Sequence, residues 1–257
     1  MTDTLKVALL QREIVWGDPA KNRENFLRAI EQCSKADLYI LPEMFSTGFC
    51  SKSQFFAEPA SNSSLEWMKE CALRFNAAIA GSIAIDDAGM HYNRFYFVKP
   101  DGEFDYYDKR HLFTYGGESN FFKCGKKRKI VEYKGFRILL QICYDLRFPV
   151  FSRNGNDYDL AIYVASWPAS RADVWSTLLK ARAIENQCFI IGANRVGDDP
   201  ESHYSGDSAI LDAYGRTIAA CPPETECEAY AELSLAELDE FRKKFPVLND
   251  RDIFELK

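Results

Sequence analysis

The sequence lacks the long hydrophobic and basic segments that mark membrane proteins and nucleic-acid-binding proteins. No apolar stretch approaches the ~18 residues of a membrane-spanning helix, and the residues after Met1 are too few and too polar for the hydrophobic region of a secretion signal. The formal net charge is −6, and the longest basic run covers only residues 126–129. We therefore expect a cytoplasmic protein with no nucleic-acid partner and no membrane partner.

The cysteine spacings of a disulfide framework or a zinc ribbon are also absent. The eight cysteines lie at positions 33, 50, 71, 124, 143, 188, 221 and 227. A cytoplasmic chain of this length needs neither disulfides nor structural zinc. The histidines lack ligand spacing, and no glycine-rich phosphate loop follows a strand, so we expect no metal and no organic cofactor.

The composition is apolar enough for a large core. The chain has 257 residues, of which 47% are hydrophobic and 14% aromatic. A layered α/β domain of this length can be one unit, so we predict a single domain over residues 1–257, with roughly the last 15 residues as a C-terminal tail. The tail carries apolar side chains, which predicts packing on its own subunit or on a neighbour, and we expect a homodimer.

Apolar runs of strand length alternate with amphipathic segments along the chain. Strand-like runs cover residues 5–10, 37–41, 79–85, 94–98, 104–107, 136–142, 159–164 and 189–196, with two or three more before residue 233. Helical patterns begin at Asp18-Pro19, cover 63–76 and 171–187, and extend from Ser234 to before Pro246. Turns at 86–89 and 100–102 predict a meander, and Lys134-Gly135 predicts a hairpin.

These elements predict an α/β fold in four layers, αββα. The strands are apolar on both faces, which requires helices over the sheets, and about a dozen strands exceed a comfortable open sheet. Two sheets packed face to face with helices outside them satisfy both conditions. The order of strand, crossover and strand that ends at residues 37–41 is repeated before residues 159–164. The two halves are therefore expected to be built alike.

Cys143 has the sequence context of a nucleophile. It directly follows the strand-like run 136–142 and opens the heptapeptide Cys-Tyr-Asp-Leu-Arg-Phe-Pro, residues 143–149. A thiol at the end of a buried strand is held rigidly on one side and can face solvent on the other, as a nucleophile requires. Cys33 and Cys71 instead lie on helical apolar stripes, which is typical of small buried side chains.

A cysteine nucleophile needs a base and a group that stabilises the oxyanion. The three histidines are possible bases, but nothing in the sequence selects one of them. Glu43 follows a strand end, the same structural position as Cys143, although strand ends are often polar without a function. Lys109 also lies just past a strand, although an exposed ion pair with Asp108 would explain it as well.

Taken together, these segments resemble the nitrilase superfamily of carbon–nitrogen hydrolases. The three blocks that carry the resemblance, in order and approximate separation, are residues 41–45, 107–113 and 143–149. Gly117-Glu118 resembles the second glutamate of the family, and residues 181–187 resemble its helix motif, so the resemblance covers almost the whole chain. Segments similar to the bacterial omega-amidase branch are residues 146–154, 164–169 and 204–208.

The resemblance implies roles for five groups. Cys143 would attack an amide carbonyl and expel ammonia, leaving a thioester. Glu43 would take the thiol proton and later activate water, for which burial must raise its pKa. Lys109 and the backbone N–H of Tyr144 would stabilise the oxyanion, and Glu118 would orient Lys109 and the substrate amide.

The resemblance also implies a substrate class. Omega-amidases of this branch hydrolyse the terminal amide of small 2-oxo acids such as 2-oxoglutaramate and 2-oxosuccinamate. The carboxylate at the far end of such a substrate needs a cation or several donors. Arg195, Arg171, Tyr115 and the backbone near Trp167 are candidates, and the sequence does not rank them.

Aromatic residues are expected to wall a small, narrow pocket. Phe45, Phe113 and Trp167 are the candidates, although core packing would explain each of them as well. Arg147, four residues past the nucleophile, is assigned a structural role and is expected to be buried against an acid such as Glu185.

Two alternative functions remain open at this point. The same catalytic residues could act on nitriles or N-carbamoyl groups, because these substrates pass through the same thioester-type chemistry. A binding module of the same fold without activity is the alternative from another class, since the presence of the residue types does not establish their geometry.

Overall fold

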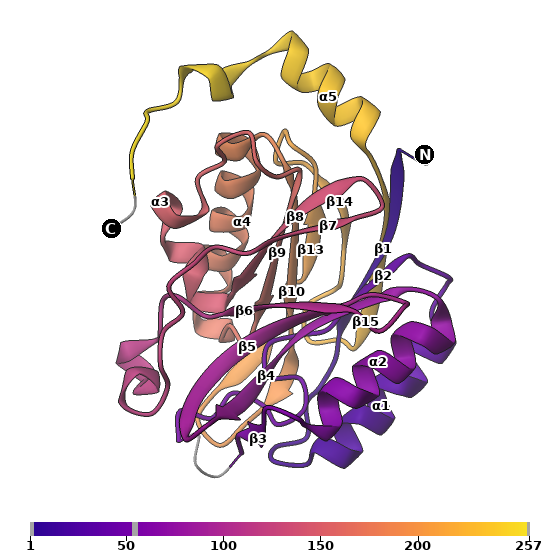
Figure 1. Ribbon diagram of the computed structural model, residues 1–257, viewed down its shortest axis with the longest axis vertical. Helices are drawn as coiled ribbons and strands as arrows, with labels where there is room; N and C mark the ends of the chain where they lie inside the picture. Colours follow the sequence, from indigo (N-terminus) through magenta and orange to yellow (C-terminus); the bar gives the residue numbers. More distant parts are fainter. Residues whose placement is uncertain (1–2, 53–55, 256–257) are drawn as a thin grey trace.

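Two β-sheets face each other, and helices cover their outer surfaces (Figure 1). The structure is a computed structural model that describes residues 3–52 and 56–255. The first sheet contains, in spatial order, β15 (Cys227–Ser234), β1 (Thr4–Gln11), β2 (Leu38–Ile40), β4 (Ala78–Asp87), β5 (Met90–Val98) and β6 (Phe104–Asp108), with β3 (Glu58–Pro59) paired to β4. The second contains β14 (Thr217–Ala220), β13 (Ala209–Leu211), β10 (Phe189–Asn194), β9 (Leu160–Ala165), β8 (Phe136–Ile142) and β7 (Ile130–Tyr133).

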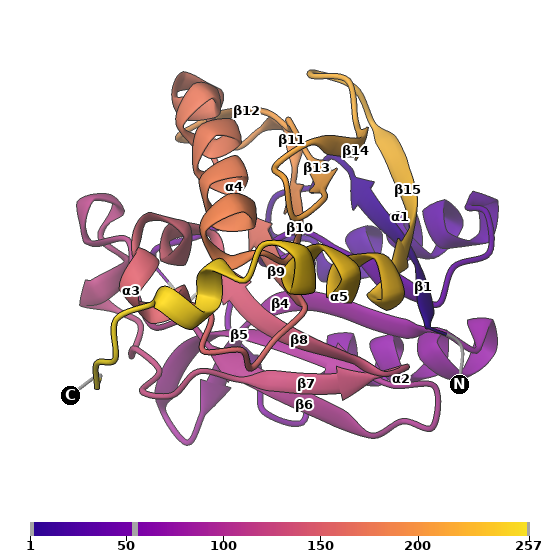
Figure 2. The ribbon, with the colours of Figure 1, turned by 90° about the horizontal axis from the view of Figure 1, so that it is seen from above.

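The helices lie where the hydrophobic pattern predicts them. Helices α1 (Pro19–Gln32) and α2 (Ser63–Phe75) pack on the first sheet, and α4 (Ala172–Asn186) packs on the second (Figures 1 and 2). Asp18 caps α1 by accepting a hydrogen bond of 2.9 Å from the backbone of Lys21. Ser234 caps α5 (Leu235–Lys244), as expected from the sequence. The layer order is thus the predicted αββα.

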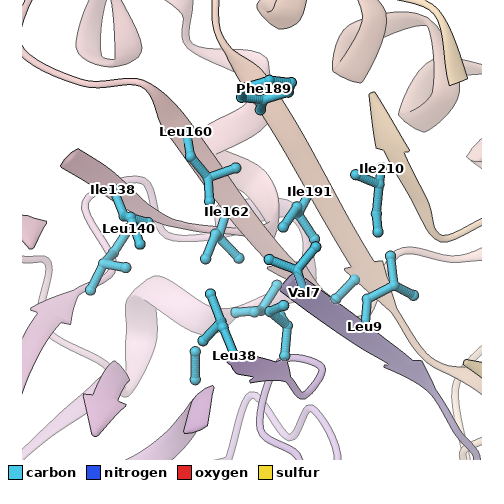
Figure 3. Close-up of a cluster of buried hydrophobic side chains, with 14 of the residues drawn as sticks. Val7, Leu9, Leu38, Ile138, Leu140, Leu160, Ile162, Phe189, Ile191 and Ile210 are labelled. Carbon is cyan, nitrogen blue, oxygen red and sulfur yellow. The ribbon is translucent and has the colours of Figure 1, made fainter. Parts of the chain in front are cut away.

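The main core fills the space between the two sheets (Figure 3). Val7, Leu9 and Leu38 from the first sheet meet Ile162 and Ile191 from the second, and all five are buried. The strands need apolar side chains on both faces, because each sheet also contacts helices on its outer face. This double burial explains why their sequences read as continuous apolar runs.

Both sheets have the same central arrangement of three parallel strands. In the first sheet β1, β2 and β4 are parallel, and in the second β8, β9 and β10 are parallel. Strand β6 runs in the same direction as β4, because each is antiparallel to β5 between them. The chain segments that follow β2, β6, β8 and β9 therefore leave the sheets at carboxyl ends, and these segments form the site.

The last third of the chain contains more strands than the sequence indicates. Four strands follow residue 200, where two or three are predicted, because β12 (His203–Ser205) and β13 have only three residues each. Such short runs carry little periodic signal. Strand β11 (Val196–Asp198) pairs with β12 in a hairpin that belongs to neither large sheet. A short helix, α3 (Pro149–Ser152), follows the turn after β8.

The C-terminal tail extends from α5 across the end of α4 toward α3 (Figures 1 and 2). Ile253 and Phe254 line a surface cavity together with Val150 and Arg153 of the α3 region. Arg251 donates to Gly155 O at 3.3 Å, so this part of the tail contacts its own chain, whereas Ile253 is 97% exposed. In residues 3–52 and 56–255, no helix is long and apolar enough to cross a membrane.

Candidate active site

Cys143 lies at a sharp turn directly after β8. Its φ angle is 46°, in the left-handed region that residues other than glycine and asparagine seldom occupy. A 3-10 turn of residues 143–147 begins at this residue. The thiol is partly exposed and lines a pocket, so the strained backbone presents it to the solvent side of the strand end.

Asp145 holds this turn in place from behind. Its Oδ1 accepts hydrogen bonds from the backbone N of His111 at 3.0 Å and pairs with His111 Nδ1 at 2.7 Å. Its Oδ2 accepts from Ile142 N at 3.0 Å and from the Tyr107 hydroxyl at 2.8 Å. His111 therefore supports the turn that carries Cys143 and does not contact the thiol as a base.

Glu43 is buried at the turn after β2 and faces the thiol. Its Oε1 accepts a hydrogen bond from Lys109 Nζ at 2.9 Å, and its Oε2 accepts one from Ser166 N at 2.8 Å. The Cys143 thiol lines the same pocket, with its Sγ 4.0 Å from the backbone oxygen of Ser166, the residue whose N–H donates to Glu43. The carboxylate is thus fixed on both oxygens and placed where it can accept the thiol proton.

Lys109 connects the two glutamates. Its Nζ donates to Glu118 Oε1 at 3.1 Å and Oε2 at 3.0 Å in addition to Glu43, and all three side chains are fully buried. Glu118 Oε2 also accepts a hydrogen bond of 2.6 Å from Phe113 N. The backbone N of Lys109 donates to Asn93 O of strand β5 at 2.9 Å.

The electrostatics of this cluster keep Lys109 charged and the thiol protonated. Burial disfavours the ammonium, but the attraction of Glu118 and Glu43 outweighs it and raises the pKa of Lys109. Burial, assisted by the negative charge of Glu43, raises the pKa of Glu118. Burial and Glu43 likewise raise the pKa of the Cys143 thiol well above its usual range. A nucleophile in this state requires a base at the moment of attack.

The thiol opens into a pocket of about 260 Å³. Glu43, Lys109 and Cys143 line it from one side. Phe113 and Trp167, two of the three aromatics expected at the pocket, line it as well, and Tyr115 lies at the mouth with 92% of its surface exposed. The volume suits a molecule of a few carbon atoms rather than a polymer.

Two arginines line the same pocket. Arg147 lies with its guanidinium carbon 5.0 Å from the Trp167 ring centroid, and the Arg171 guanidinium carbon lies 5.6 Å from the Phe113 ring centroid. Among the described residues neither guanidinium forms an ion pair, although the carboxylates of Asp199 and Glu201 line the same pocket. The pocket therefore contains two arginines that form no ion pair with a described residue.

The position of Arg147 corrects the structural role assigned to it from the sequence. Glu185, its expected partner, instead pairs with Arg182 at 2.9 Å. Arg182 and Glu185 are three residues apart on α4, so they face each other on the helix surface. Arg147 remains at the pocket.

Two predicted pocket residues lie elsewhere. Phe45 is fully buried in the core, where its ring centroid is 5.7 Å from that of Phe26 and 5.6 Å from that of Trp67. Arg195 is buried behind Tyr204, and its guanidinium donates to the backbone oxygens of Ile14 and Asp198. Neither belongs to the pocket lining, because the turn after Glu43 directs Phe45 into the core and Arg195, which directly follows β10, lies beneath the β11–β12 hairpin.

Several site residues are absent from the sequence prediction. Phe49 lines the pocket with its ring 5.4 Å from Lys109 Nζ, and Ser166 donates to Glu43 from the end of β9. Asn93 donates to both glutamates from the middle of β5. The position of Ser166 at a strand end could have identified it from the sequence. Phe49 and Asn93 reach the site only through contacts between segments that are distant in the sequence.

A metal site is not formed by the described residues. Within 3–52 and 56–255, no group of three or more histidine, cysteine, aspartate and glutamate side chains is arranged to hold an ion. All eight cysteines are free thiols.

Comparison with known proteins gives matches over nearly the whole chain. The family model described as carbon-nitrogen hydrolase matches residues 6–243. A relative named omega-amidase YafV from Yersinia enterocolitica is 48% identical over 98% of this chain and 99% of its own. A 2-oxoglutaramate amidase from Bacillus subtilis is 34% identical over 95% of this chain and 96% of its own.

A solved structure has the same fold over the full length. XC1258 from Xanthomonas campestris, described as a CN-hydrolase superfamily protein with an arsenic adduct in its active site, is 41% identical and covers 99% of both chains with a TM-score of 0.95. Nit3 from Saccharomyces cerevisiae, a member of branch 10 of the nitrilase superfamily, is 25% identical with a TM-score of 0.86 and covers 95% of each chain.

Proposed function

This chain belongs to the carbon-nitrogen hydrolase family and hydrolyses carbon–nitrogen bonds, and from this premise we propose that it is an omega-amidase. The substrate class is the small 2-oxo acids with a terminal amide, such as 2-oxoglutaramate and 2-oxosuccinamate. Relatives named omega-amidase and 2-oxoglutaramate amidase support this class, and so does the size of the pocket.

The first half-reaction begins at the thiol. Glu43 accepts the proton of Cys143, and the sulfur attacks the amide carbon to give a tetrahedral intermediate. When the carbon–nitrogen bond breaks, the proton passes from Glu43 to the leaving nitrogen and ammonia departs. The product of this step is a thioester on Cys143. The position of the thiol and the carboxylate in the lining of one pocket supports this assignment.

The second half-reaction returns the enzyme to its starting state. Glu43 takes a proton from water, and the resulting hydroxide attacks the thioester carbon. Collapse of the intermediate breaks the carbon–sulfur bond and releases the acid, while the proton returns from Glu43 to the sulfur. One carboxylate thus acts as base and acid in turn, as its position between the thiol and the pocket permits.

The oxyanion in both steps would be stabilised by Lys109 and by the backbone N–H of Tyr144. Lys109 is charged and lines the pocket, and Tyr144 N is the second residue of the 3-10 turn, where N–H groups lack a partner within the turn. Removing one such donor typically costs about 3 kcal/mol of transition-state stabilisation. Glu118 accepts from Lys109 and so fixes the direction of its ammonium.

The two pocket arginines that form no ion pair among the described residues carry the omega-amidase proposal. A substrate with a carboxylate at its far end supplies the negative charge that Arg147 and Arg171 lack. Guanidinium groups bind carboxylates through paired hydrogen bonds, which adds orientation to charge. A simple aliphatic nitrile or amide would leave both arginines unpaired in the pocket.

Ammonia release from a panel of substrates tests this proposal. The panel consists of 2-oxoglutaramate, glutaramate, an aliphatic nitrile and an N-carbamoyl amino acid. We expect the highest kcat/KM for 2-oxoglutaramate. Highest turnover of the nitrile or the N-carbamoyl compound would refute the omega-amidase assignment while leaving the family unchanged, and no turnover of any compound would favour a binding module.

We also propose that the enzyme acts in the cytoplasm as a homodimer. The eight free thiols are consistent with a reducing compartment. Val150, with 54% of its surface exposed, and Ile253, with 97%, lie at the same surface cavity beside α3 and form an apolar area that a second copy can cover.

A further inference from the structure

Asn93 occupies an unusual position for an asparagine. It lies within strand β5 and is fully buried. Its Nδ2 donates to Glu43 Oε1 at 2.7 Å and to Glu118 Oε1 at 3.3 Å. Its backbone oxygen accepts from Lys109 N at 2.9 Å. One residue therefore contacts all three charged members of the site.

The orientation of this side-chain amide is fixed by the carboxylates. With the amide rotated by half a turn, Oδ1 would face two carboxylate oxygens and repel both. In the observed orientation the NH₂ group uses one N–H for each glutamate. The buried Oδ1 is left without a partner among the described residues, which costs stability. An asparagine retained at such a cost points to a task in the site rather than in the core.

The charge balance of the site shows what that task is. Within the buried trio of Glu43, Glu118 and Lys109, two carboxylates share one ammonium, so the trio has one more acid than base. Excess charge in a buried site favours uptake of a proton, and the raised pKa of Glu118 shows this tendency. The two N–H groups of Asn93 oppose proton uptake, because they stabilise the charged form of each carboxylate.

We propose that Asn93 is a positioning residue that keeps Glu43 and Glu118 deprotonated and side by side, and that fixes which oxygen of Glu43 faces the thiol. Glu43 Oε1 accepts from both Lys109 and Asn93, whereas among the described residues Oε2 accepts from Ser166 N alone, so Oε2 keeps a lone pair for the thiol proton. Without Asn93, Glu43 keeps its hydrogen bonds to Lys109 and Ser166 but loses its third donor, so the carboxylate is held less firmly and the pair takes up a proton at higher pH. This inference rests on the proposed role of Glu43 as the base.

The test uses Asn93→Leu, which keeps the size of the side chain and removes both donors. A matched control is Asn154→Leu, because Asn154 is also fully buried and donates through Nδ2 to two backbone oxygens, but lies outside the site. Initial rates with 2-oxoglutaramate are measured as a function of pH for both variants and for the unchanged protein.

For Asn93→Leu we expect the acid limb of the kcat/KM profile to move up by about one pH unit and kcat to fall about tenfold. KM is expected to change less than twofold, since Asn93 does not line the pocket. The limb of the Asn154→Leu profile is expected to stay in place. An unmoved limb in Asn93→Leu, with or without a loss of rate, would overturn the proposal, because a residue that only supports the fold lowers the rate at every pH alike.

Two further measurements distinguish the proposed role of Asn93 from a defect in folding and do not depend on the assigned substrate. Asn93→Asp keeps the shape and adds a third carboxyl group, so its acid limb is expected to move further than that of Asn93→Leu. The rate at which iodoacetamide alkylates Cys143, measured as a function of pH, has the same acid limb and requires no turnover of an omega-amide. Failure of the unchanged protein to hydrolyse 2-oxoglutaramate would refute the proposed function alone, whereas an alkylation profile identical in Asn93→Asp and the unchanged protein would refute the role of Asn93.

Discussion

At the scale of single residues, the pocket combines a neutral nucleophile with two arginines that form no ion pair among the described residues. The Cys143 thiol has a raised pKa and therefore depends on Glu43 for its reactivity. In the proposed function, Arg147 and Arg171 would attract the carboxylate of the substrate and so place its amide at the thiol. Reactivity and selectivity thus belong to different side chains, and substitutions can separate them.

Replacing either arginine by leucine tests its role in substrate binding. For Arg147→Leu and Arg171→Leu we expect KM for 2-oxoglutaramate to rise about tenfold to hundredfold, because each change removes a hydrogen bond between charged groups. Arg216→Leu serves as control, since Arg216 lies over Tyr214, away from the pocket. An unchanged KM in both pocket variants would show that the carboxylate is held elsewhere.

The site residues that could be predicted from the sequence are those that follow the end of a strand. Glu43, Lys109 and Cys143 each follow a strand, and the resemblance to a known family joined them into one site. Trp167 was a candidate on similar grounds. Arg195 was misplaced, because whether a side chain at a strand end turns toward a pocket or under a hairpin depends on packing that no local pattern records.

At the scale of secondary structure, the turn after β8 is the element on which the chemistry depends. Asp145 accepts hydrogen bonds from Ile142, His111 and Tyr107, which belong to three different segments. These bonds hold Cys143 in its left-handed conformation. The turn is therefore fixed by tertiary contacts rather than by its own sequence.

Asp145→Asn is expected to weaken this turn. The substitution turns one acceptor into a donor that faces N–H and O–H groups, so buried donors lose their partner. We expect a loss of about 2–4 kcal/mol in the free energy of unfolding by urea, with a lower kcat as well. Asp157→Asn is a suitable control, since Asp157 is partly exposed. Equal stability of the Asp145 variant and the unchanged protein would contradict this account of the turn.

The β11–β12 hairpin contains a pH-dependent contact. His203 pairs with Asp198 at 2.8 Å and with Glu224 at 3.0 Å, and these partners raise the pKa of the imidazole. Because the pKa of His203 is higher in the folded state, protonation of the imidazole stabilises the fold. This contribution is fully present below the unfolded pKa of about 6.5, and it is lost as the pH rises through the higher folded pKa.

Comparison of the unchanged protein with His203→Gln tests this contact. The difference in the free energy of unfolding is expected to favour the unchanged protein near pH 6 and to shrink toward zero near pH 9. A difference that stays constant over this range would show that the charge of His203 contributes nothing.

The elements themselves differed in how well they could be predicted. The long helices and the central strands have strong periodic signals and caps, such as Asp18 before α1 and Ser234 before α5. Strands β3, β12 and β13 have two or three residues and no such signal. Their positions follow from pairing with neighbouring strands, which a local reading of the chain does not include.

At the scale of the whole molecule, the layer order was predictable and the site geometry was not. Strands that are apolar on both faces require covered sheets, and their number requires two of them, so αββα follows from general packing rules. The distances that bring Asn93 and Ser166 to Glu43 result from the register of strands far apart in the sequence. Only the assembled sheets define them.

The proposed homodimer can be tested by sedimentation equilibrium. We expect a dimer at micromolar concentration, and we expect Val150→Glu to shift the mass toward that of a monomer, because a buried unpaired carboxylate opposes association. Leu73→Glu is the control, since Leu73 is also highly exposed but lies on α2, far from this cavity in sequence and outside its lining. A monomeric unchanged protein would end this proposal.

The most direct test of the central claim, that Cys143 forms a thioester with the substrate, is mass spectrometry of rapidly quenched enzyme with 2-oxoglutaramate. We predict a mass increase equal to the substrate minus ammonia, located on the peptide that contains Cys143. We further predict that Glu43→Gln shows little of this adduct and that Cys143→Ala shows none and releases no ammonia. Full ammonia release by Cys143→Ala would contradict the mechanism.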